Sequence, residues 1–320
     1  MIPWALLLAH LIDRIVGDPR RLPHPVVGMG WLITRVEKLL HPLTERKPGR
    51  GVERLIGCLL PLTVVGSVWL LSFLLLSGVG ALSRWAAFVL EVWLIATTLA
   101  TRGLADAALS IYRALAAGNL AQARKALSMV VGRDTEELDE PEVVRGAVET
   151  TAENLVDAVT APLFFAAVGG APLALAYRAV NTLDSMVGYK DERYLHLGWA
   201  SARLDDLANW LPARLTVLPL LTALWWTGHS PRRAWRILRR DAGKHPSPNS
   251  GITESLMAGG LGIQLGGTNR YRGTLSHRAF LGDPSRPKEP EDIRESVRIL
   301  KAAGWVYVLL LALICYTVSG

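Results

Sequence analysis

Cysteine is nearly absent from this chain. Only 2 of the 320 residues are Cys, and both Cys58 and Cys315 lie in apolar stretches. Neither a disulfide framework nor a cysteine-rich metal site is therefore available. Three motifs of well-known enzyme classes are missing as well: the sequence contains no GxxxxGKS or GxxxxGKT phosphate loop, no HExxH zinc helix and no GxSxG nucleophile turn.

Charge is absent from several long stretches. Residues 55–83, 158–177, 215–231 and 302–320 contain no Asp, Glu, Lys or Arg, and residues 85–101 contain only Glu91. These lengths approach or exceed the roughly 17–25 residues that span a hydrocarbon core. With 50% hydrophobic residues and a mean hydropathy of +0.26, the chain is too apolar for an ordinary soluble domain. We predict apolar segments at about residues 2–16, 55–79, 81–101, 155–177, 211–228 and 303–319.

The net charge of +7 and the isoelectric point near 9.6 reflect basic residues spread over the polar loops rather than gathered in one nucleic-acid-binding stripe. We therefore expect a lipid bilayer and no nucleic acid as partner. Retention of positive loops in the cytoplasm explains the distribution, and it places the loop between the first two apolar segments on the cytoplasmic side. That loop contains Arg20, Arg21, Arg35, Lys38, Arg46, Lys47, Arg50 and Arg54.

Helical periodicity defines the remaining organisation. Residues 103–149 have apolar positions at helical spacing, broken at Gly118-Asn119, and predict a polar helical hairpin. Residues 232–301 are expected to form a polar loop region. The predicted fold is an all-α, polytopic integral membrane protein with one domain over residues 1–320.

A simple crossing by residues 155–177 would place the acidic stretch 178–209 outside the cell and the basic region 232–301 inside. Helix breakers in both apolar segments suggest a solution, because irregular backbone is tolerated where protein shields it. These breakers are Pro162, Gly169-Gly170, Pro172, Pro212 and Pro219. We predict that one or both segments are broken or re-entrant, so that all polar motifs lie on the cytoplasmic face of the membrane.

Acidic residues spaced by four precede the segment 155–177. Glu149, Glu153 and Asp157 would share one helix face, where their like charges repel. A cation or a basic partner such as Arg145 or Arg178 must compensate. The pattern indicates either a face that binds a metal or an ammonium group, or a solvated acidic stripe.

Three pairs of oxygen ligands at i, i+3 spacing follow: Asn154 with Asp157, Asn181 with Asp184, and Asp206 with Asn209. Mg²⁺ uses few protein ligands of this kind and shares substrate phosphates. Asp205 and Asp206 are also explained as partners of a helix N-terminal dipole.

The stretch Lys244-His-Pro-Ser-Pro-Asn-Ser-Gly251 excludes regular helix because of its two prolines. A helix start follows at Ser250 or Thr253, where free N–H groups favour an anion. His245 is a candidate acid, base or phosphate donor, or a structural residue. The glycine-rich run 259–267 lacks the strand and the lysine of a nucleotide loop, and helix packing or flexibility explains it better.

Four motifs together resemble one known family. They are Asp13-Arg-Ile-Val-Gly-Asp-Pro19 with Pro23-His-Pro-Val26, Glu149-Thr-Thr-Ala-Glu-Asn-Leu-Val-Asp157, Tyr177-Arg-Ala-Val-Asn-Thr-Leu-Asp-Ser-Met186 with Gly188-Tyr-Lys190, and His245-Pro-Ser-Pro-Asn-Ser-Gly251. In this order, over nearly the whole chain, they resemble the CbiB/CobD family of cobalamin biosynthesis.

The resemblance implies an adenosylcobinamide-phosphate synthase in the cell membrane, with its active site on the cytoplasmic face. Such an enzyme joins the corrinoid adenosylcobyric acid to an amino-alcohol phosphate with ATP and Mg²⁺, beside other late cobalamin-assembly membrane enzymes. On this reading Glu149 and His245 are catalytic; Arg178, Lys190, Ser247, Asn249 and Ser250 bind substrate or phosphate; and Glu153, Asp157, Asn181, Asp184, Asp205 and Asp206 bind the metal. Two alternatives remain: an Mg²⁺-dependent membrane transferase acting on a lipid-like phosphate, and a transporter that uses Glu91.

Overall fold

The computed structural model describes residues 1–17, 24–45, 49–189 and 193–319. Helices account for most of these residues, and the one sheet among them is a two-stranded antiparallel hairpin. Contacts divide the chain into unit 1, with Met1–Ala100, Ala161–Asn209 and Leu310–Gly320, and unit 2, with Thr101–Thr160 and Trp210–Leu309. Each unit is assembled from segments that are separated in sequence. One domain over residues 1–320 stays a prediction.

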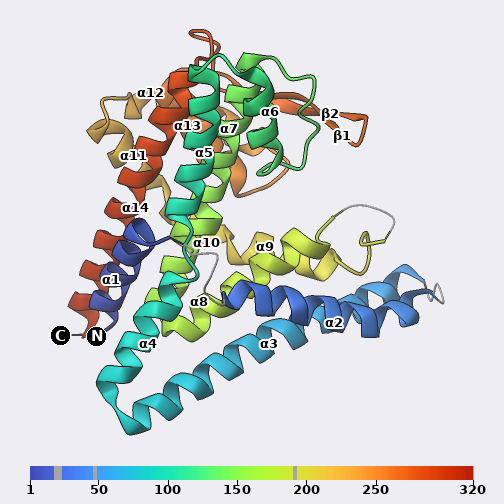
Figure 1. The fold of residues 1–320 in the computed structure, drawn as a ribbon, viewed down its shortest axis with the longest axis vertical. Helices are drawn as coiled ribbons and strands as arrows, with labels where there is room; N and C mark the ends of the chain where they lie inside the picture. Colours follow the sequence, from blue (N-terminus) through green and yellow to red (C-terminus); the bar gives the residue numbers. More distant parts are fainter. Residues whose placement is uncertain (18–23, 46–48, 190–192, 320) are drawn as a thin grey trace. The chain divides into compact units, whose positions relative to one another are not determined.

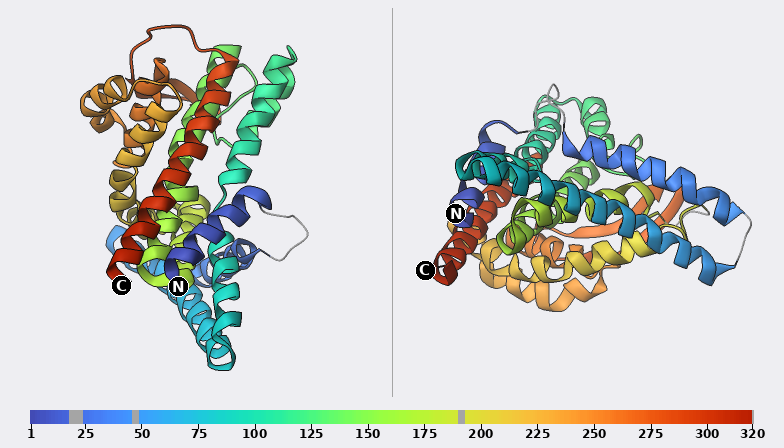
Figure 2. Two further views of the ribbon diagram at one scale, coloured as in Figure 1. Left: turned by 90° about the vertical axis from the view of Figure 1, so that its left-hand side faces the viewer. Right: turned by 90° about the horizontal axis from the view of Figure 1, so that it is seen from below.

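Unit 1 is a helical assembly around α8. Its helices are α1 (Ile2–Ile15), α2 (Pro25–Glu45), α3 (Arg50–Leu82), α4 (Arg84–Ala96), α8 (Ala161–Val187) and α9 (Trp199–Ala208). Helix α8 contacts each of the other five helices. Helices α2 and α3 lie side by side (Figure 1, Figure 2). The segment between the first two apolar stretches, expected as a loop, therefore contains α2, because Val26, Met29 and Ile33 recur at helical spacing.

Unit 2 contains shorter elements and the hairpin. These are α5 (Thr101–Ala116), α6 (Leu120–Ser128), α7 (Glu140–Leu155), the π-helix η1 (Val156–Thr160), α10 (Trp210–Leu215), α11 (Val217–Trp226), α12 (Pro231–Asp241), η2 (Ala242–Lys244), α13 (Ser250–Leu261), β1 (Leu265–Tyr271), β2 (Thr274–Leu281) and most of α14 (Pro290–Ser319). Gly118 at φ +69° ends α5, and the Asn119 side chain accepts from Gln122 N at 2.9 Å to begin α6. Helices α5 and α6 pack against each other on either side of the predicted break, whereas residues 129–149 of the predicted hairpin form a loop and the first part of α7.

Helix α13 is the centre of unit 2. Every residue from Gly251 to Leu261 is buried, and the helix contacts α7, α10, α11, α12 and both strands. A Cβ on Gly259 would lie 2.7 Å from Ala234 Cα, and one on Gly260 would lie 2.3 Å from Leu224 Cδ2. These glycines therefore serve helix packing, as predicted. The prediction of a polar loop region over 232–301 is wrong, because an apolar helix buried on all sides and a hairpin interrupt it.

In the described part of the chain, four helices are long and apolar enough to cross a membrane: Arg50–Leu82, Arg84–Ala116, Glu140–Val187 and Pro290–Val318. Two further helical segments, Trp199–Leu215 and Val217–Trp226, meet at a bend of 45°. Together they would form a fifth span if they cross the membrane as one broken helix. The chain is thus an all-α polytopic membrane protein. Helix α1, with 14 residues, is shorter than any of these four helices.

Helix α8 is broken within its apolar part. Gly169 (φ −144°, ψ 24°) and Gly170 (φ 65°, ψ −163°) leave helical geometry just before Pro172. The freed N–H of Ala171 hydrogen-bonds to the Glu91 carboxylate of α4. The Glu91 carboxylate accepts a hydrogen bond from a backbone N–H that the break leaves without a helical partner. Its negative charge also interacts favourably with the positive N-terminal end of the second helical half. The predicted break in segment 155–177 is confirmed.

Candidate functional site

The predicted site residues fall into two groups, one in each unit. Unit 2 holds Glu149, Glu153, Asp157, His245, Ser247, Asn249 and Ser250, and unit 1 holds Arg178, Asn181, Asp184, Asp205 and Asp206. Lys190 lies outside the described residues.

Glu149 is enclosed by two guanidinium groups. Arg133 Nη2 lies 2.5 Å from its Oε2, and Arg145 Nη1 lies 3.1 Å from its Oε1. Oε1 also accepts from the N–H of Gly266 at 2.8 Å, where β1 begins. Asn269 Oδ1 accepts from both arginines, at 2.6 Å from Arg133 and 3.0 Å from Arg145. The group joins α7, the loop before it and β1.

These contacts assign Glu149 a structural role in this conformation. A general base must reach a substrate proton, whereas both oxygens of Glu149 already accept charged or backbone hydrogen bonds and its side chain is only 6% exposed. Proton transfer to Glu149 would break a doubly paired buried carboxylate. The catalytic role predicted for it stays a prediction, and these contacts do not favour it.

Glu153, one turn further along α7, is placed differently. Its Oε1 accepts from Ser250 Oγ at 3.2 Å, and its side chain is half-buried. Within the described ranges no second hydrogen bond to Glu153 is found. The carboxylate therefore keeps capacity for a substrate group or a cation.

The loop before α13 has the shape that its prolines predict. Residues 245–249 are not helical, and α13 begins at Ser250. Ser247 Oγ accepts from the N–H groups of Asn249 and Ser250, at 3.3 Å each, so it caps the helix start. Arg214 Nη1 approaches Asn249 Oδ1 at 3.4 Å. The predicted contacts Ser247, Asn249 and Ser250 are thus brought together with Glu153.

His245 is turned inward. Its side chain is 4% exposed, Nδ1 accepts from Ser247 N at 3.0 Å, and Nε2 lies 3.5 Å from Glu254 Oε1. Burial lowers the pKa of His245 below its usual range. Contact with phosphate would require the ring to leave Glu254, so the catalytic role of His245 stays a prediction.

Sequence reasoning missed Glu254, Arg133 and Asn269 as members of this group. Burial raises the pKa of Glu254 well above its usual range, and the charges of Glu149 and Glu153 raise it further. A carboxylate inside the otherwise uncharged stretch 249–269 was the available signal for Glu254. Arg133 and Asn269 had none, because 136 positions separate them.

The second group, in unit 1, brings carboxylates of α8 and α9 together. Asp205 interacts with the like charge of Asp184 and with the Asn181 side chain. Asp205 Oδ2 accepts from Asn209 Nδ2 at 3.0 Å, and Tyr177 OH donates to Asn209 Oδ1 at 2.8 Å. These hydrogen bonds fix the orientation of Asp205.

Asp206 and Arg178 lie at the border of this second group. Asp206 Oδ2 is 3.6 Å from Arg203 Nη1, and its side chain is 37% exposed. Arg178 Nη1 donates to Asn181 Oδ1 at 3.3 Å. A Cβ on Gly188 would lie 2.1 Å from Asp184 Oδ1, so only glycine leaves room for that carboxylate.

Asn181, Asp184 and Asp205 fit a divalent cation. The Asp205 Oδ1 atom is buried and has no hydrogen-bond partner among the described residues, and the charge of Asp184 acts on it. Two neighbouring like charges that are half-buried favour a cation or a proton between them. Among the described residues, no three His, Cys, Asp or Glu side chains form a preassembled metal site. Mg²⁺ is commonly bound through one or two carboxylates together with substrate phosphates and water.

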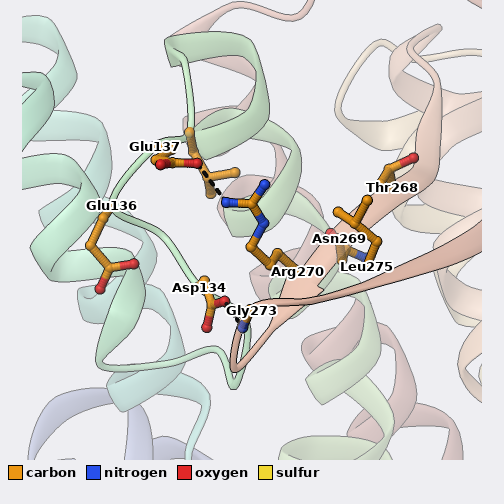
Figure 3. Close-up of a pocket in the computed structure, with 9 residues that line it drawn as sticks. Asp134, Glu136, Glu137, Thr268, Asn269, Arg270, Gly273 and Leu275 are labelled. Atoms are coloured by element: carbon orange, nitrogen blue, oxygen red, sulfur yellow. Dashed lines mark hydrogen bonds and ion pairs between the residues drawn. The ribbon is translucent and has the colours of Figure 1, made fainter.

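A cavity of about 390 Å³ lies elsewhere in unit 2, between the loop before α7 and the β-hairpin (Figure 3). Arg270 on its wall pairs with Glu137 at 2.7 Å. Asp134 accepts from the N–H groups of Arg272 and Gly273, at 3.0 and 2.8 Å, and holds the turn between β1 and β2. No predicted site residue lines this cavity.

Comparison with known proteins identifies the family. The chain matches the family model of the CobD/Cbib protein over residues 6–300. The chain belongs to the CobD/CbiB family. The cobalamin biosynthesis protein CobD of Geobacter metallireducens is 51% identical over 307 residues, which cover 96% of this chain and 95% of the relative. The resemblance drawn from the motifs is confirmed.

Other members of the CobD/CbiB family are similar over the same length. CobD of Halalkalibacterium halodurans is 47% identical over 320 residues, covering 97% of this chain and 95% of its own. The cobalamin biosynthesis protein CbiB of Salmonella typhimurium is 44% identical over 311 residues, covering 97% and 96%. No solved structure matches the chain.

Proposed function

We propose that this member of the CobD/CbiB family acts in cobalamin biosynthesis as an ATP- and Mg²⁺-dependent ligase. It would join the amine of aminopropanol phosphate, or of a related amino alcohol, to a carboxylate of adenosylcobyric acid and form adenosylcobinamide phosphate. The supporting observation is the similarity, over nearly the full length, to relatives named cobalamin biosynthesis proteins CobD and CbiB.

Amide formation from a carboxylate and an ammonium ion needs two kinds of help. The carboxylate has to become an acyl phosphate at the expense of ATP, and the ammonium has to lose a proton before it can attack. The first step requires that phosphate charge be neutralised, and the second requires a base near the amine. The polar residues of unit 1 suit the first need, and the polar residues of unit 2 suit the second.

The group in unit 1 suits the metal. Bound Mg²⁺ would neutralise charge on the phosphates of ATP and of the acyl phosphate. Asn181, Asp184 and Asp205 would hold it, because Oδ1 of Asp205 has no hydrogen-bond partner in the described ranges and Asp205 lies within the charge influence of Asp184. Asp206, paired with Arg203, would contribute through charge alone. Arg178 would bind phosphate oxygens.

The group in unit 2 suits the amine. Glu153 is better placed than Glu149 to accept the ammonium proton, because it has one neutral donor, Ser250, where Glu149 has two guanidinium groups. Ser250 would orient the Glu153 carboxylate, and Asn249 would offer its amide to a substrate oxygen. Glu153 is thereby proposed as base rather than as metal ligand, and Asp157 has no proposed step.

The direct test supplies membranes containing this chain with adenosylcobyric acid, aminopropanol phosphate, ATP and Mg²⁺. The expected product is adenosylcobinamide phosphate, formed together with ADP and phosphate. A strain lacking this condensation should regain growth on cobyric acid when it carries the chain. No product with any amino alcohol, in membranes that contain the folded protein, would overturn the proposal. Phosphate release from a lipid would instead support a transferase, and substrate accumulation in sealed vesicles a transporter.

A further inference from the structure

His245 and Glu254 form a buried pair to which the proposed function assigns no step. Nε2 of His245 lies 3.5 Å from Oε1 of Glu254, and the two side chains are 4% and 2% exposed. Neither atom has a well-formed hydrogen bond to any other group in the described part of the chain. Leaving two buried polar atoms unsatisfied is costly, so a hydrogen bond between them is the expected arrangement.

The tautomer of His245 follows from its other nitrogen. The N–H of Ser247 points at Nδ1 from 3.0 Å. The Ser247 carbonyl oxygen lies 3.2 Å from the same nitrogen, but a hydrogen on Nδ1 would collide with the amide hydrogen already there. Nδ1 is therefore an acceptor, and a neutral imidazole carries its proton on Nε2, directed at Glu254.

The charges around the pair favour a neutral Glu254. Glu149 and Glu153 of α7 face it, and Arg133 and Arg278 oppose them. Burial and the two carboxylates raise the pKa of Glu254, while burial lowers the pKa of His245. With both partners neutral, Nε2–H donates to the carbonyl oxygen of a carboxylic acid.

We propose that Glu254 is a positioning residue for the loop 245–249: it accepts the hydrogen bond of His245 Nε2–H, and this contact holds Ser247 and Ser250 against Glu153. The contacts form one chain. His245 Nδ1 binds the Ser247 amide, Ser247 Oγ binds the amides of Asn249 and Ser250, and Ser250 Oγ binds Glu153 at 3.2 Å.

Gly251 allows the loop to close against the helix. A Cβ at this position would lie 2.6 Å from His245 Cβ and 2.4 Å from the carbonyl oxygen of Ala242. The backbone at Gly251 therefore lies close to η2 and to the start of the loop at His245. The loop geometry is independent of the proposed function, which enters only where condensation is measured.

Amide hydrogen exchange of the purified full chain in detergent tests the contact directly. Glu254→Ala should raise exchange at Ser247, Asn249 and Ser250 by roughly tenfold or more, whereas Glu254→Gln, which keeps a neutral carbonyl oxygen, should change it by less than about threefold. Glu295→Gln is the matched control, because His229 Nε2 lies 3.9 Å from Glu295 Oε2 in a second His–Glu pair. This control should leave exchange at 245–250 unchanged.

A second measurement does not depend on whether Glu254→Ala folds. Because the pKa of Glu254 is raised in the folded state, its contribution to stability is full below the unfolded value of about 4.3 and declines as pH rises. Glu254→Gln should remove this decline of the melting temperature as pH rises above the unfolded value. Condensation by Glu254→Gln should persist as well.

Three results would overturn the proposal. Faster exchange in Glu254→Gln, equal to that of Glu254→Ala, would mean that an ionised carboxylate is needed. Unchanged exchange in both variants would mean that the contact does not hold the loop. Equal pH slopes in the wild type and Glu254→Gln would mean that Glu254 titrates normally. Absence of condensation in the wild type would remove only the proposed function.

Discussion

Arg145 and Glu149 lie one turn apart on α7, with Nη1 3.1 Å from Oε1 and side chains 1% and 6% exposed. Arg145 also donates to the carbonyl oxygens of Gly266 at 2.8 Å and Thr268 at 3.1 Å. One guanidinium therefore connects the helix that carries Glu153 to the first strand of the hairpin. A buried ion pair of this kind favours one arrangement of the chain over others more than it increases the net free energy of unfolding.

Arg145→Met should destabilise the protein strongly. Removing the guanidinium leaves Glu149 with Arg133 and the N–H of Gly266 and frees two strand carbonyls, and breaking a buried pair costs about 3–5 kcal/mol. Thermal unfolding of the purified protein in detergent measures the loss. Arg102→Met, at an exposed pair with Asp106, is the control and should cost at most about 1 kcal/mol. Equal effects of the two variants would contradict the structural role of Arg145.

Glu149→Gln and Glu153→Gln should separate stability from catalysis. Glu149→Gln weakens two buried ion pairs and should lower the melting temperature, with a loss of condensation that follows the loss of folded protein. Glu153→Gln keeps the contact to Ser250 and should leave the melting temperature nearly unchanged while lowering the condensation rate roughly 10²-fold or more, the scale of general-base catalysis. A fully active Glu153→Gln would return the base role to Glu149 or to another residue.

The sequence predicted the spans, the broken segment and the shaped loop, because each depends on local chemistry. A long stretch without charged residues predicts a membrane span. Gly169-Gly170 followed by Pro172 predicts a break in a helix, and the two prolines within residues 246–248 exclude a regular helix there. The same reasoning placed Asp184 and Asp205 together, although twenty residues separate them, only because both lie in motifs rich in oxygen ligands.

Long-range pairing could not be predicted. Glu37 has no motif around it, yet it is buried and accepts from Arg193 at 2.6 Å and Tyr194 at 3.0 Å. The spacing of Glu149 and Glu153 indicates a shared helix face and says nothing of Arg133, which lies before that helix and pairs with Glu149 at 2.5 Å. The base role of Glu149 rests on the family resemblance and stays a prediction. The hairpin was missed because β1 contains two glycines and little alternation of apolar and polar residues, the usual signal of a strand.

Stability should fall at acidic pH partly through Asp241. Burial alone would raise the pKa of Asp241, but hydrogen bonds from Arg240, Lys244 and the N–H of Gly282 hold it below its usual range. Because the pKa of Asp241 is lower in the folded state than in the unfolded state, the ionised carboxylate stabilises the fold at neutral pH. This stabilisation is lost as pH falls below the unfolded-state pKa of about 3.9. Asp241→Asn should lower the melting temperature at neutral pH and flatten its acid dependence. A variant with the wild-type acid slope would contradict this assignment.

Asp205→Asn should raise the Mg²⁺ requirement. The change removes one of the two facing carboxylates but keeps a ligand oxygen, so saturation should need roughly tenfold more Mg²⁺, equal to about 1.4 kcal/mol of binding energy. Titration of condensation and of the Mg²⁺-dependent rise in melting temperature gives two readouts. Asp206→Asn, at the exposed pair with Arg203, is the comparison variant: it removes charge alone and should raise the Mg²⁺ requirement less than Asp205→Asn does. Equal Mg²⁺ requirements in the wild type and Asp205→Asn would remove Asp205 from the metal site.

Single cysteines should place both polar groups on the cytoplasmic side. Basic loops are retained in the cytoplasm, and the break at Gly169-Gly170 allows the chain to return without crossing. With Cys58 and Cys315 replaced by Ser, cysteines at the exposed positions Ser185 and Gly243 mark units 1 and 2.

A membrane-impermeant thiol reagent should label Ser185→Cys and Gly243→Cys in inverted membrane vesicles and spare both in intact cells. Gly243 suits the purpose because a Cβ there meets no atom within 4 Å, so the substitution leaves the neighbouring loop undisturbed. Labelling of position 185 alone in intact cells would mean that α8 crosses the bilayer completely. Asp184 would then face the outside, where ATP is not supplied, and the metal role proposed for Asn181, Asp184 and Asp205 would fail with it.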